Sequence, residues 1–282
     1  MLGSKLFQEF FEKNYKVRGS SRLILKELNK YKSFIDSNID VYDLDKLKSK
    51  IMNFKPEIII NCIGLIKQKI NKIDEKDIFY INSIFPHELY KISELMKAKL
   101  IHFSTDCVFD GKTGNYDDNQ IPNALDVYGF SKKLGEINYK NSLTIRTSII
   151  GHEMKSKYSL LEWFLNKKKN CEGYSKAYFS GLPTIEIFEF LEKYILNNKN
   201  ICGIYNLSSN KISKFELLNL IAKTYSKNIK IKKNRNFKID RSLNSKKLKK
   251  ITSYKNPSWN QLVKKMFKNH MNHIQTKKNL HV

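Results

Sequence analysis

Two short runs of apolar, mostly β-branched residues place the strongest constraint on the fold of this chain. Residues 56–64 read PEIIINCIG, and residues 99–105 read KLIHFST. Neither run alternates between apolar and polar residues, which is typical of a parallel strand that is buried on both faces. Residues 78–97, between the two runs, have the apolar periodicity of a helix. A strand, a helix and a second buried strand in this order predict a parallel sheet covered by helices.

The same alternation of helical and strand-like segments covers the first half of the chain. Apolar residues recur at helical spacing over residues 4–13 and 46–54, and a further helix is expected over residues 128–140. Residues 15–17 form a short apolar segment, and LTIRTSII at residues 143–150 is typical of another strand. We therefore predict an α/β fold with a doubly wound parallel sheet.

The second half of the chain follows a less regular pattern. GYSKAYFSGLPT at residues 173–184 indicates a loop with a short strand. Helices are expected over residues 184–196 and 212–225, and a strand over residues 203–208. Ser213 is a candidate N-cap for the second of these helices.

The pattern divides the chain into three parts. Residues 1–150 form the regular α/β domain, and residues 151–266 form a smaller α/β part that is interleaved with it. The basic tail at residues 267–282 is expected to fray.

The composition is typical of a globular cytoplasmic protein. Apolar residues make up 41% of the chain, and no run approaches the ~18 apolar residues of a membrane span. The four cysteines are widely spaced without a CxxC pair, which indicates reduced thiols and argues against a zinc or other metal site. The net charge of +25 comes mainly from lysines spread along the chain. We interpret it as a compositional bias and expect no nucleic-acid partner, because nucleic-acid-binding proteins usually concentrate arginine and aromatic residues on one face.

The candidate chemistry lies between residues 101 and 136. Ser104 and Thr105 end a predicted strand, and Tyr128 and Lys132 are four residues apart on a predicted helix, so that both point from one face. An ammonium beside a phenol lowers the pKa of the phenol from ~10 toward neutrality. Such a phenol can pass a proton to a carbonyl oxygen while a hydride reaches the carbon. The hydroxyl of Thr105 would hydrogen-bond the same oxygen.

These motifs resemble the extended short-chain dehydrogenase/reductase family, and within it the nucleotide-sugar reductases of the dTDP-4-dehydrorhamnose type. NCIG at residues 61–64, INS at 81–83, IRTS at 145–148, GLPT at 181–184, DRSLNSKKL at 240–248 and PSW at 257–259 are similar to segments of that family. The resemblance covers nearly the whole chain and implies a Rossmann-like domain that binds NADPH, with NADH as the alternative.

The resemblance also implies roles for single residues. Tyr128 would be the proton donor, Lys132 would hold the nicotinamide ribose, Thr105 would polarise the substrate carbonyl, and Asn82 would support the site. The implied cofactor-binding residues are Gly3, Arg18, Arg22, Asp40, Val41, Asn61, Cys62, Gly64, Ser104, Tyr128, Lys132 and Thr147. The implied substrate-binding residues are Asp106, Cys107, Val108 and Trp163.

Simpler interpretations of several residues stay open. Asn82 could only tie a helix to a strand, Asp40 could be a turn residue, and Trp163 could be a packing residue. Arg18 and Arg22 follow the short apolar segment at residues 15–17 without a nearby acid, which favours a 2′-phosphate and hence NADPH. In a chain this basic, both arginines could equally be solvated side chains.

The first residues, MLGS, are similar to the end of the family's glycine-rich GxxGxxG turn, with Gly3 as its last glycine. The strand that precedes this turn in the family is missing from the printed sequence. Its absence would leave backbone groups of the sheet unpaired, each costing about 1–3 kcal/mol if buried. We expect that translation starts upstream of Met1, with degeneration of the gene as the alternative.

The resemblance implies a reductase of a nucleotide-linked 4-keto-6-deoxysugar, in the synthesis of a cell-surface polysaccharide such as O-antigen. Its substrate would be a nucleotide-diphosphate sugar, and a homodimer is left open. Two alternatives remain: a reductase-like protein that binds a cofactor or partner without turnover, and a nucleotide-sugar epimerase. Cys107 stands where the family often has tyrosine, which bears on the identity of the sugar.

Overall fold

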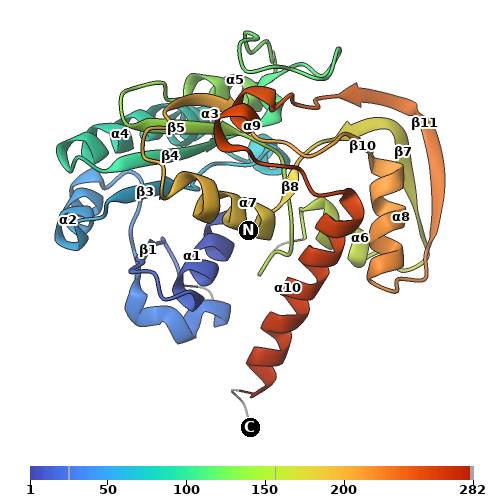
Figure 1. The fold of residues 1–282 in the computed structure, drawn as a ribbon, viewed down its shortest axis with the longest axis horizontal. Helices are drawn as coiled ribbons and strands as arrows, with labels where there is room; N and C mark the ends of the chain where they lie inside the picture. The colour runs from blue at the N-terminus through green and yellow to red at the C-terminus, as the bar shows by residue number, and fades with distance from the viewer. Residues whose placement is uncertain (25, 156, 280–282) are drawn as a thin grey trace.

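A computed structural model describes residues 1–282 except 25, 156 and 280–282. Its main sheet has four parallel strands in the order β3-β4-β5-β9. These strands are β3 (Ile58–Asn61), β4 (Lys99–Ser104), β5 (Ser142–Arg146) and β9 (Gly203–Asn206). Figure 1 shows helices on both sides of this sheet. The predicted α/β fold with a doubly wound parallel sheet is confirmed.

The two faces of the sheet are covered by different helices. On one face, Ile101 and Phe103 of β4 pack in a cluster with α1 (Leu2–Glu12) and α7 (Thr184–Phe190). On the other face, Leu100 of β4 packs with α2 (Leu44–Phe54) and α4 (Phe85–Leu95). Successive residues of β4 therefore enter different cores, which explains why all six residues of the strand are buried.

The helix predicted over residues 78–97 is built from three pieces. They are α3 (Glu75–Phe79), one π-helical segment at Tyr80–Ile84, and α4. Asn82 lies in the π-helical segment, a local distortion that often occurs at functional sites. In the described part of the chain, no helix is long and apolar enough to cross a membrane.

The sheet is interrupted beside β3. The short strands β1 (Gly19–Ser20) and β2 (Ile35–Asp36) pair in parallel with each other, separately from the main sheet. The predicted gap in the sheet is therefore present. Ile58, Ile59 and Ile60 of β3 are only half-buried, although their sequence predicts a fully buried strand. They are partly exposed because, among the described residues, β3 pairs on one side only.

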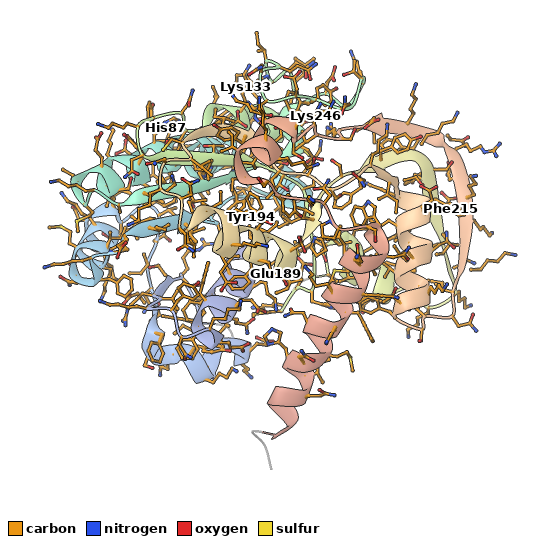
Figure 2. All side chains as sticks on the ribbon, in the orientation of Figure 1. His87, Lys133, Glu189, Tyr194, Phe215 and Lys246 are labelled. Carbon is orange, nitrogen blue, oxygen red and sulfur yellow. The ribbon has the colours of Figure 1, made fainter. Side chains whose placement is uncertain are left out.

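The second part of the chain contains a three-stranded sheet in the order β10-β7-β11. Its strands are β10 (Ile212–Ser213), β7 (Asn170–Phe179) and β11 (Lys230–Asp240). The prediction of a loop over most of β7 is wrong. Gly173, which favoured a loop, is a point of close packing, because an added Cβ would lie 2.9 Å from the Cα of Phe215. Figure 2 shows Phe215 on the adjacent helix α8 (Lys214–Thr224).

The start of α8 agrees with the sequence. The Ser213 hydroxyl accepts a hydrogen bond from the Glu216 backbone N–H, and the Glu216 carboxylate accepts one from the Ser213 backbone N–H. This capping box confirms Ser213 as the N-cap.

The interleaving of the two parts is visible in β9, which comes from the second part and joins the first sheet (Figure 1). The boundary predicted at residue 266 falls within a helix, because α10 (Trp259–Asn279) continues through it. Residues 267–279 are thus helical and not a frayed tail, and residues 280–282 lie outside the described part.

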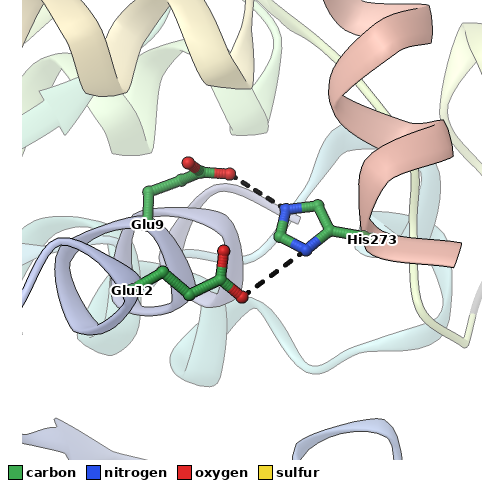
Figure 3. Close-up of side chains that lie close together, drawn as sticks. All are labelled: Glu9, Glu12 and His273. Carbon is green, nitrogen blue, oxygen red and sulfur yellow. Dashed lines mark hydrogen bonds and ion pairs between the residues drawn. The ribbon is translucent and has the colours of Figure 1, made fainter. Parts of the chain in front are cut away.

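Polar contacts attach α10 to α1. The imidazole of His273 lies between two carboxylates, with Nε2 3.0 Å from Glu9 Oε1 and Nδ1 3.6 Å from Glu12 Oε1 (Figure 3). The Asn269 amide also donates to Glu9. Burial acts to raise the pKa of Glu9, but hydrogen bonds from His273 and Asn269 lower it to about 2. These contacts explain why the end of α10 is ordered.

Candidate active site

A cavity of about 600 Å³ lies at the carboxyl ends of β3, β4 and β5. The residues that follow these strands, Cys62, Thr105 and Thr147, all line it. The opposite wall comes from the second part of the chain and includes Tyr178 and Lys214. Ligands of open parallel sheets bind at this edge, so the fold itself marks the cavity as a candidate active site.

Helix α5 (Val127–Leu134) brings Tyr128 and Lys132 to this cavity. Asp126 caps the helix by accepting a hydrogen bond from Gly129 N at 3.1 Å. Gly129 also allows close approach, because an added Cβ would lie 2.2 Å from the Cys107 carbonyl oxygen. The helix is therefore held directly against the segment that carries Thr105.

Helix α5 ends six residues before the predicted end at residue 140, because its C-cap, Gly135, packs against the backbone of Asn82. An added Cβ at Gly135 would lie 1.9 Å from the Asn82 carbonyl oxygen. This contact fixes the distance between α5 and the π-helical segment.

The hydroxyl of Thr105 is oriented by its neighbours. Thr105 Oγ1 accepts a hydrogen bond from Cys107 N at 3.1 Å and donates one to Asp106 Oδ1 at 3.1 Å. Thr105 and Asp106 line the cavity together with Cys107. Burial raises the pKa of the Cys107 thiol to about 12, so this cysteine is a neutral part of the wall.

The electrostatics of the Tyr128–Lys132 pair differ from the sequence-based expectation. Burial raises the pKa of Tyr128 above its ordinary value, whereas the adjacent ammonium was expected to lower it. Lys132 Nζ donates a hydrogen bond to the Phe103 carbonyl oxygen at 2.9 Å. Burial lowers the pKa of Lys132 to about 8. Loss of hydration is the largest cause of both pKa shifts.

Asn82 acts on the site from behind the cavity wall. Its Oδ1 accepts a hydrogen bond from Leu65 N at 2.8 Å, and its Nδ2 donates to Leu65 O at 3.3 Å and to Ser131 Oγ at 3.1 Å. These bonds tie the segment after β3 to α5. Gly64 lies in the same segment, and an added Cβ there would be in van der Waals contact with Asn82 Oδ1 at 3.4 Å and with Lys132 Nζ at 3.8 Å.

A buried ion pair supports the carboxyl ends of β4 and β5. Arg146 donates to both oxygens of Glu136, through Nε and Nη2, at 2.7 Å each. The side chains are only 4% and 5% exposed. The Ser104 hydroxyl donates to the same carboxylate at 2.8 Å, so the pair holds the residue before Thr105 in position.

Three basic side chains also line the cavity, those of Lys67, Lys214 and Arg241. Burial lowers the pKa of Lys214, while the charge of Asp106 acts in the opposite direction. Arg241 Nε donates to the Phe109 carbonyl oxygen at 2.8 Å, which orients the guanidinium. This arrangement can attract an anionic group to the end of the cavity away from the sheet.

Sequence reasoning did not single out these three basic residues. Lys214 directly follows the helix cap Ser213, and Arg241 begins the segment RSLNSKKL. Neither position carries a pattern that separates it from the other basic residues. The usable signal was the similarity of the segment around Arg241 to the family.

The predicted site residues fall into two groups. Those that line the cavity are Cys62, Gly64, Ser104, Thr105, Asp106, Cys107, Tyr128, Lys132 and Thr147. Those that are not among its lining residues are Gly3, Arg18, Arg22, Asp40, Val41, Asn61, Asn82, Val108 and Trp163. The roles of both groups stay predictions.

Several residues of the second group have other contacts. Arg18 forms two hydrogen bonds with the Asp36 carboxylate at 2.9 Å each, so this guanidinium has an acidic partner that the sequence did not indicate. Asp40 Oδ1 accepts a hydrogen bond from Tyr42 N, as a turn residue does. Trp163 is 37% exposed, with the Lys167 ammonium 5.0 Å from its ring centroid.

The remaining members of this group are Val41, Val108, Asn61, Arg22 and Gly3, and their surroundings differ. Val41 and Val108 are buried in apolar clusters, and Asn61 shares a hydrogen bond of 3.1 Å with His102. Arg22 is exposed. Gly3 lies in the first turn of α1, where an added Cβ would be 3.1 Å from Cys62 Cβ.

Comparisons with known proteins agree with this architecture. A family model described as the RmlD substrate binding domain matches residues 1–272. The chain is 24% identical over 239 residues to methionine adenosyltransferase 2 subunit beta from Xenopus tropicalis, covering 80% of this chain and 70% of that protein. It is 27% identical over 183 residues to a dTDP-4-dehydrorhamnose reductase from Aggregatibacter actinomycetemcomitans, covering 61% and 62%.

A similar solved structure is that of dTDP-4-dehydrorhamnose reductase from Bacillus anthracis in complex with NADP. The identity is 19%, the TM-score is 0.78, and the match covers 95% of this chain and 94% of that one. This likeness shows a shared Rossmann-like fold.

Proposed function

Because this chain belongs to the RmlD substrate-binding domain family, we propose that it uses NAD(P)H to reduce the keto group of a nucleotide-linked 4-keto-6-deoxysugar. The product would serve the synthesis of a cell-surface polysaccharide such as O-antigen. One observation carries the proposal: Thr105, Tyr128 and Lys132 line a single cavity at the carboxyl ends of the sheet. The names of two similar proteins, both dTDP-4-dehydrorhamnose reductases, support the substrate class.

The residues of the cavity fit a dinucleotide. Helix α1 has no side-chain cap at its start, so its first N–H groups are available to a pyrophosphate, and Met1 and Leu2 line the cavity. Gly64 keeps the wall beside Lys132 free of a side chain. The bound cofactor would supply a hydride to the keto carbon of the sugar.

The side chains of the protein would then handle the substrate oxygen. Thr105 would donate a hydrogen bond to the carbonyl oxygen, and Tyr128 would deliver its phenolic proton to that oxygen as the alkoxide develops. The raised pKa of Tyr128 keeps the phenol protonated, as a proton donor must be. Lys214 and Arg241 would bind the diphosphate, because charged hydrogen bonds favour anionic oxygens.

A panel of keto sugars tests the proposal. We expect oxidation of NADPH or NADH with dTDP-4-dehydrorhamnose or a related nucleotide-linked keto sugar, followed as loss of nicotinamide absorbance. The panel also compares NADPH with NADH. Arg18 was expected to bind the 2′-phosphate of NADPH, but it pairs with Asp36, so the preference between the two cofactors has to be measured. Binding of cofactor without turnover of any keto sugar would contradict the proposed reaction.

A second candidate function is that of a binding subunit without turnover. The similarity to methionine adenosyltransferase 2 subunit beta, which is named as a subunit of another enzyme, favours it. The two candidates differ in the outcome of the same panel, because a binding subunit should bind NADPH and leave it unoxidised.

The affinity for the cofactor should depend on pH through Lys132. Its pKa is lowered to about 8, so the side chain is an ammonium below about pH 8 and a neutral amine above it. If the ammonium holds the ribose, the Kd for NAD(P)H should rise as the pH passes through about 8. Titrations followed by nicotinamide fluorescence from about pH 6 to about pH 10 measure this.

Two variants complete the pH experiment. Lys132→Arg should remove the dependence, because a guanidinium stays charged throughout this range. Lys133→Arg, at the next position of the same helix but outside the cavity lining, should keep it. A wild-type Kd that stays constant across the range would rule out the role of the Lys132 charge.

Replacing Lys214 tests the diphosphate site. Lys214→Ala should raise the KM for the nucleotide sugar about 10- to 100-fold, which corresponds to the loss of one charged hydrogen bond. The Kd for NAD(P)H should not change. Lys223→Ala, an exposed lysine on the same helix, serves as the matched control. An unchanged KM would show that the anionic group binds elsewhere.

A further inference from the structure

A group of titratable side chains lies outside the candidate active site, where the end of α10 meets α1 (Figure 3). It consists of Glu9 and Glu12 on α1 and His273 on α10. One ligand atom of each residue lies within 4.8 Å of those of the other two. We refer to these three residues as the Glu–His cluster. Imidazole nitrogen and carboxylate oxygen are donors that Zn²⁺ uses in proteins.

The two nitrogens of the His273 ring differ in their contacts. Nε2 lies 3.0 Å from Glu9 Oε1, which is a hydrogen-bond distance. Nδ1 faces Glu12 Oε1 at 3.6 Å, which is too long for a hydrogen bond (Figure 3). An ionised carboxylate only accepts hydrogen bonds, so the contact with Glu9 requires a proton on Nε2. The neutral ring then has its lone pair on Nδ1, on the side of Glu12.

The separation on the Nδ1 side fits a metal ion. Bonds from Zn²⁺ to imidazole nitrogen and to carboxylate oxygen are about 2.0–2.2 Å long. Two such bonds that meet at one tetrahedral ion place their donor atoms about 3.4 Å apart. The distance of 3.6 Å between His273 Nδ1 and Glu12 Oε1 is close to this value.

Glu9 holds the imidazole in this orientation. Its Oε1 also accepts hydrogen bonds from Asn269 Nδ2 at 2.9 Å and from Lys5 Nζ at 3.1 Å, so both donors are engaged on the Nε2 side of the ring. A metal-bound histidine usually donates its second N–H to a carboxylate, which fixes the ring and makes the ligating nitrogen more basic. Glu9 and His273 already have this arrangement.

Glu12 is the more accessible of the two carboxylates. Its side chain is 36% exposed, whereas that of Glu9 is 11% exposed. Glu12 Oε1 accepts a hydrogen bond from the Tyr31 hydroxyl at 3.0 Å, and Lys30 Nζ lies 3.8 Å from it. The Lys30 side chain is itself 37% exposed, so its ammonium can turn to solvent when a cation binds. Water can reach the same side and complete the coordination of an ion.

We propose that the Glu–His cluster is a binding site for one Zn²⁺ ion. His273 Nδ1 and the Glu12 carboxylate are its ligands, and Glu9 is a positioning residue that holds the imidazole. The ion joins α10 to α1 and so stabilises the docking of residues 267–279. The proposal does not depend on the proposed enzymatic activity. The argument against a metal site from the sequence rested on cysteine spacing and does not concern these residues.

Thermal unfolding of the untagged full chain with added Zn²⁺ tests the site. We expect the Tm to rise by about 5 °C at a free Zn²⁺ concentration about 100 times its Kd, and to return to its starting value with a chelator. Mg²⁺ at the same concentration should leave the Tm unchanged, because it prefers oxygen ligands. Long-range ¹H–¹⁵N spectra should show the change at Nδ1 of His273, with Nε2 still protonated.

Variants connect the binding to the three residues. His273→Gln and Glu12→Gln should each abolish the rise in Tm. Glu9→Gln should raise the Kd for Zn²⁺ about 10- to 100-fold, the usual effect of losing an orienting partner. His270→Gln is the matched control on the same helix, because its ring stacks on His152 with the centroids 3.5 Å apart, and it should bind Zn²⁺ like the wild type. The Tm of each variant without Zn²⁺ shows that it is folded.

Three results would overturn the proposal. They are an unchanged Tm with Zn²⁺, an equal rise in Tm in the Glu12→Gln variant, and a spectral change at Nε2 of His273 in place of Nδ1. The second result would assign the bound ion to another part of the chain. An unchanged Kd in Glu9→Gln would contradict the positioning role of Glu9.

Discussion

Tyr128→Phe should lower kcat about 10²- to 10⁴-fold, which is the usual contribution of a general acid. The substitution removes only the phenolic oxygen and keeps the ring, so the packing of α5 against the segment after β4 should persist. The Kd for NAD(P)H should change little, because the aromatic ring still forms that part of the wall. Steady-state assays with the active keto sugar, together with cofactor titration, measure both quantities.

The matched control is Tyr139→Phe, which makes the same change at a tyrosine that is 47% exposed and outside the cavity lining. Its kcat should equal that of the wild type. Equal rates for Tyr128→Phe and the wild type would show that another group delivers the proton. A parallel loss of cofactor binding would instead indicate that the substitution disturbs the cavity.

Glu136→Gln should lower the free energy of unfolding by about 3–5 kcal/mol, the usual cost of removing one partner from a buried ion pair. Glutamine has nearly the same shape but leaves the Arg146 guanidinium, whose side chain is 4% exposed, without a counter-charge. It also disturbs the acceptor of the Ser104 hydroxyl. Urea denaturation, with the midpoint and the m-value fitted separately, measures the change.

The control for this variant is Glu57→Gln. The Glu57 carboxylate is 81% exposed and pairs with Lys199 at the surface, where ion pairs contribute little. We expect no measurable change. If Glu136→Gln were as stable as this control, water would have to reach the pair and solvate Arg146, contrary to its burial.

Elements with a strong local pattern were predictable. The helices α1, α2 and α8 occur where apolar periodicity indicates them, and β4 is buried throughout, as predicted. The errors came from packing between residues that are far apart in the sequence. The strand β7 contains Gly173, which looked like a loop signal but allows Phe215 of α8 to approach the sheet.

The candidate active site likewise contains residues that the sequence indicated and residues that it did not indicate. Thr105, Tyr128 and Lys132 were indicated by their spacing relative to a buried strand, and they line one cavity. The sequence favoured basic side chains of the second part as ligands of a diphosphate, but it did not indicate which ones, because Lys214 and Arg241 are ordinary basic residues until the second part of the chain folds against the first. The pKa of Tyr128 was predicted in the wrong direction, since burial and the hydrogen bond of Lys132 to Phe103 O depend on the tertiary environment.

By itself, the sequence determined the α/β class, the parallel sheet covered by helices, and the helix face that carries Tyr128 and Lys132. These features follow from periodicity and spacing, which are local properties of the chain. Only the tertiary structure decided which charges meet: Arg18 with Asp36, and Arg146 with Glu136. Contacts of this kind join residues that are distant in the chain, and their energies depend on burial, which no local pattern records.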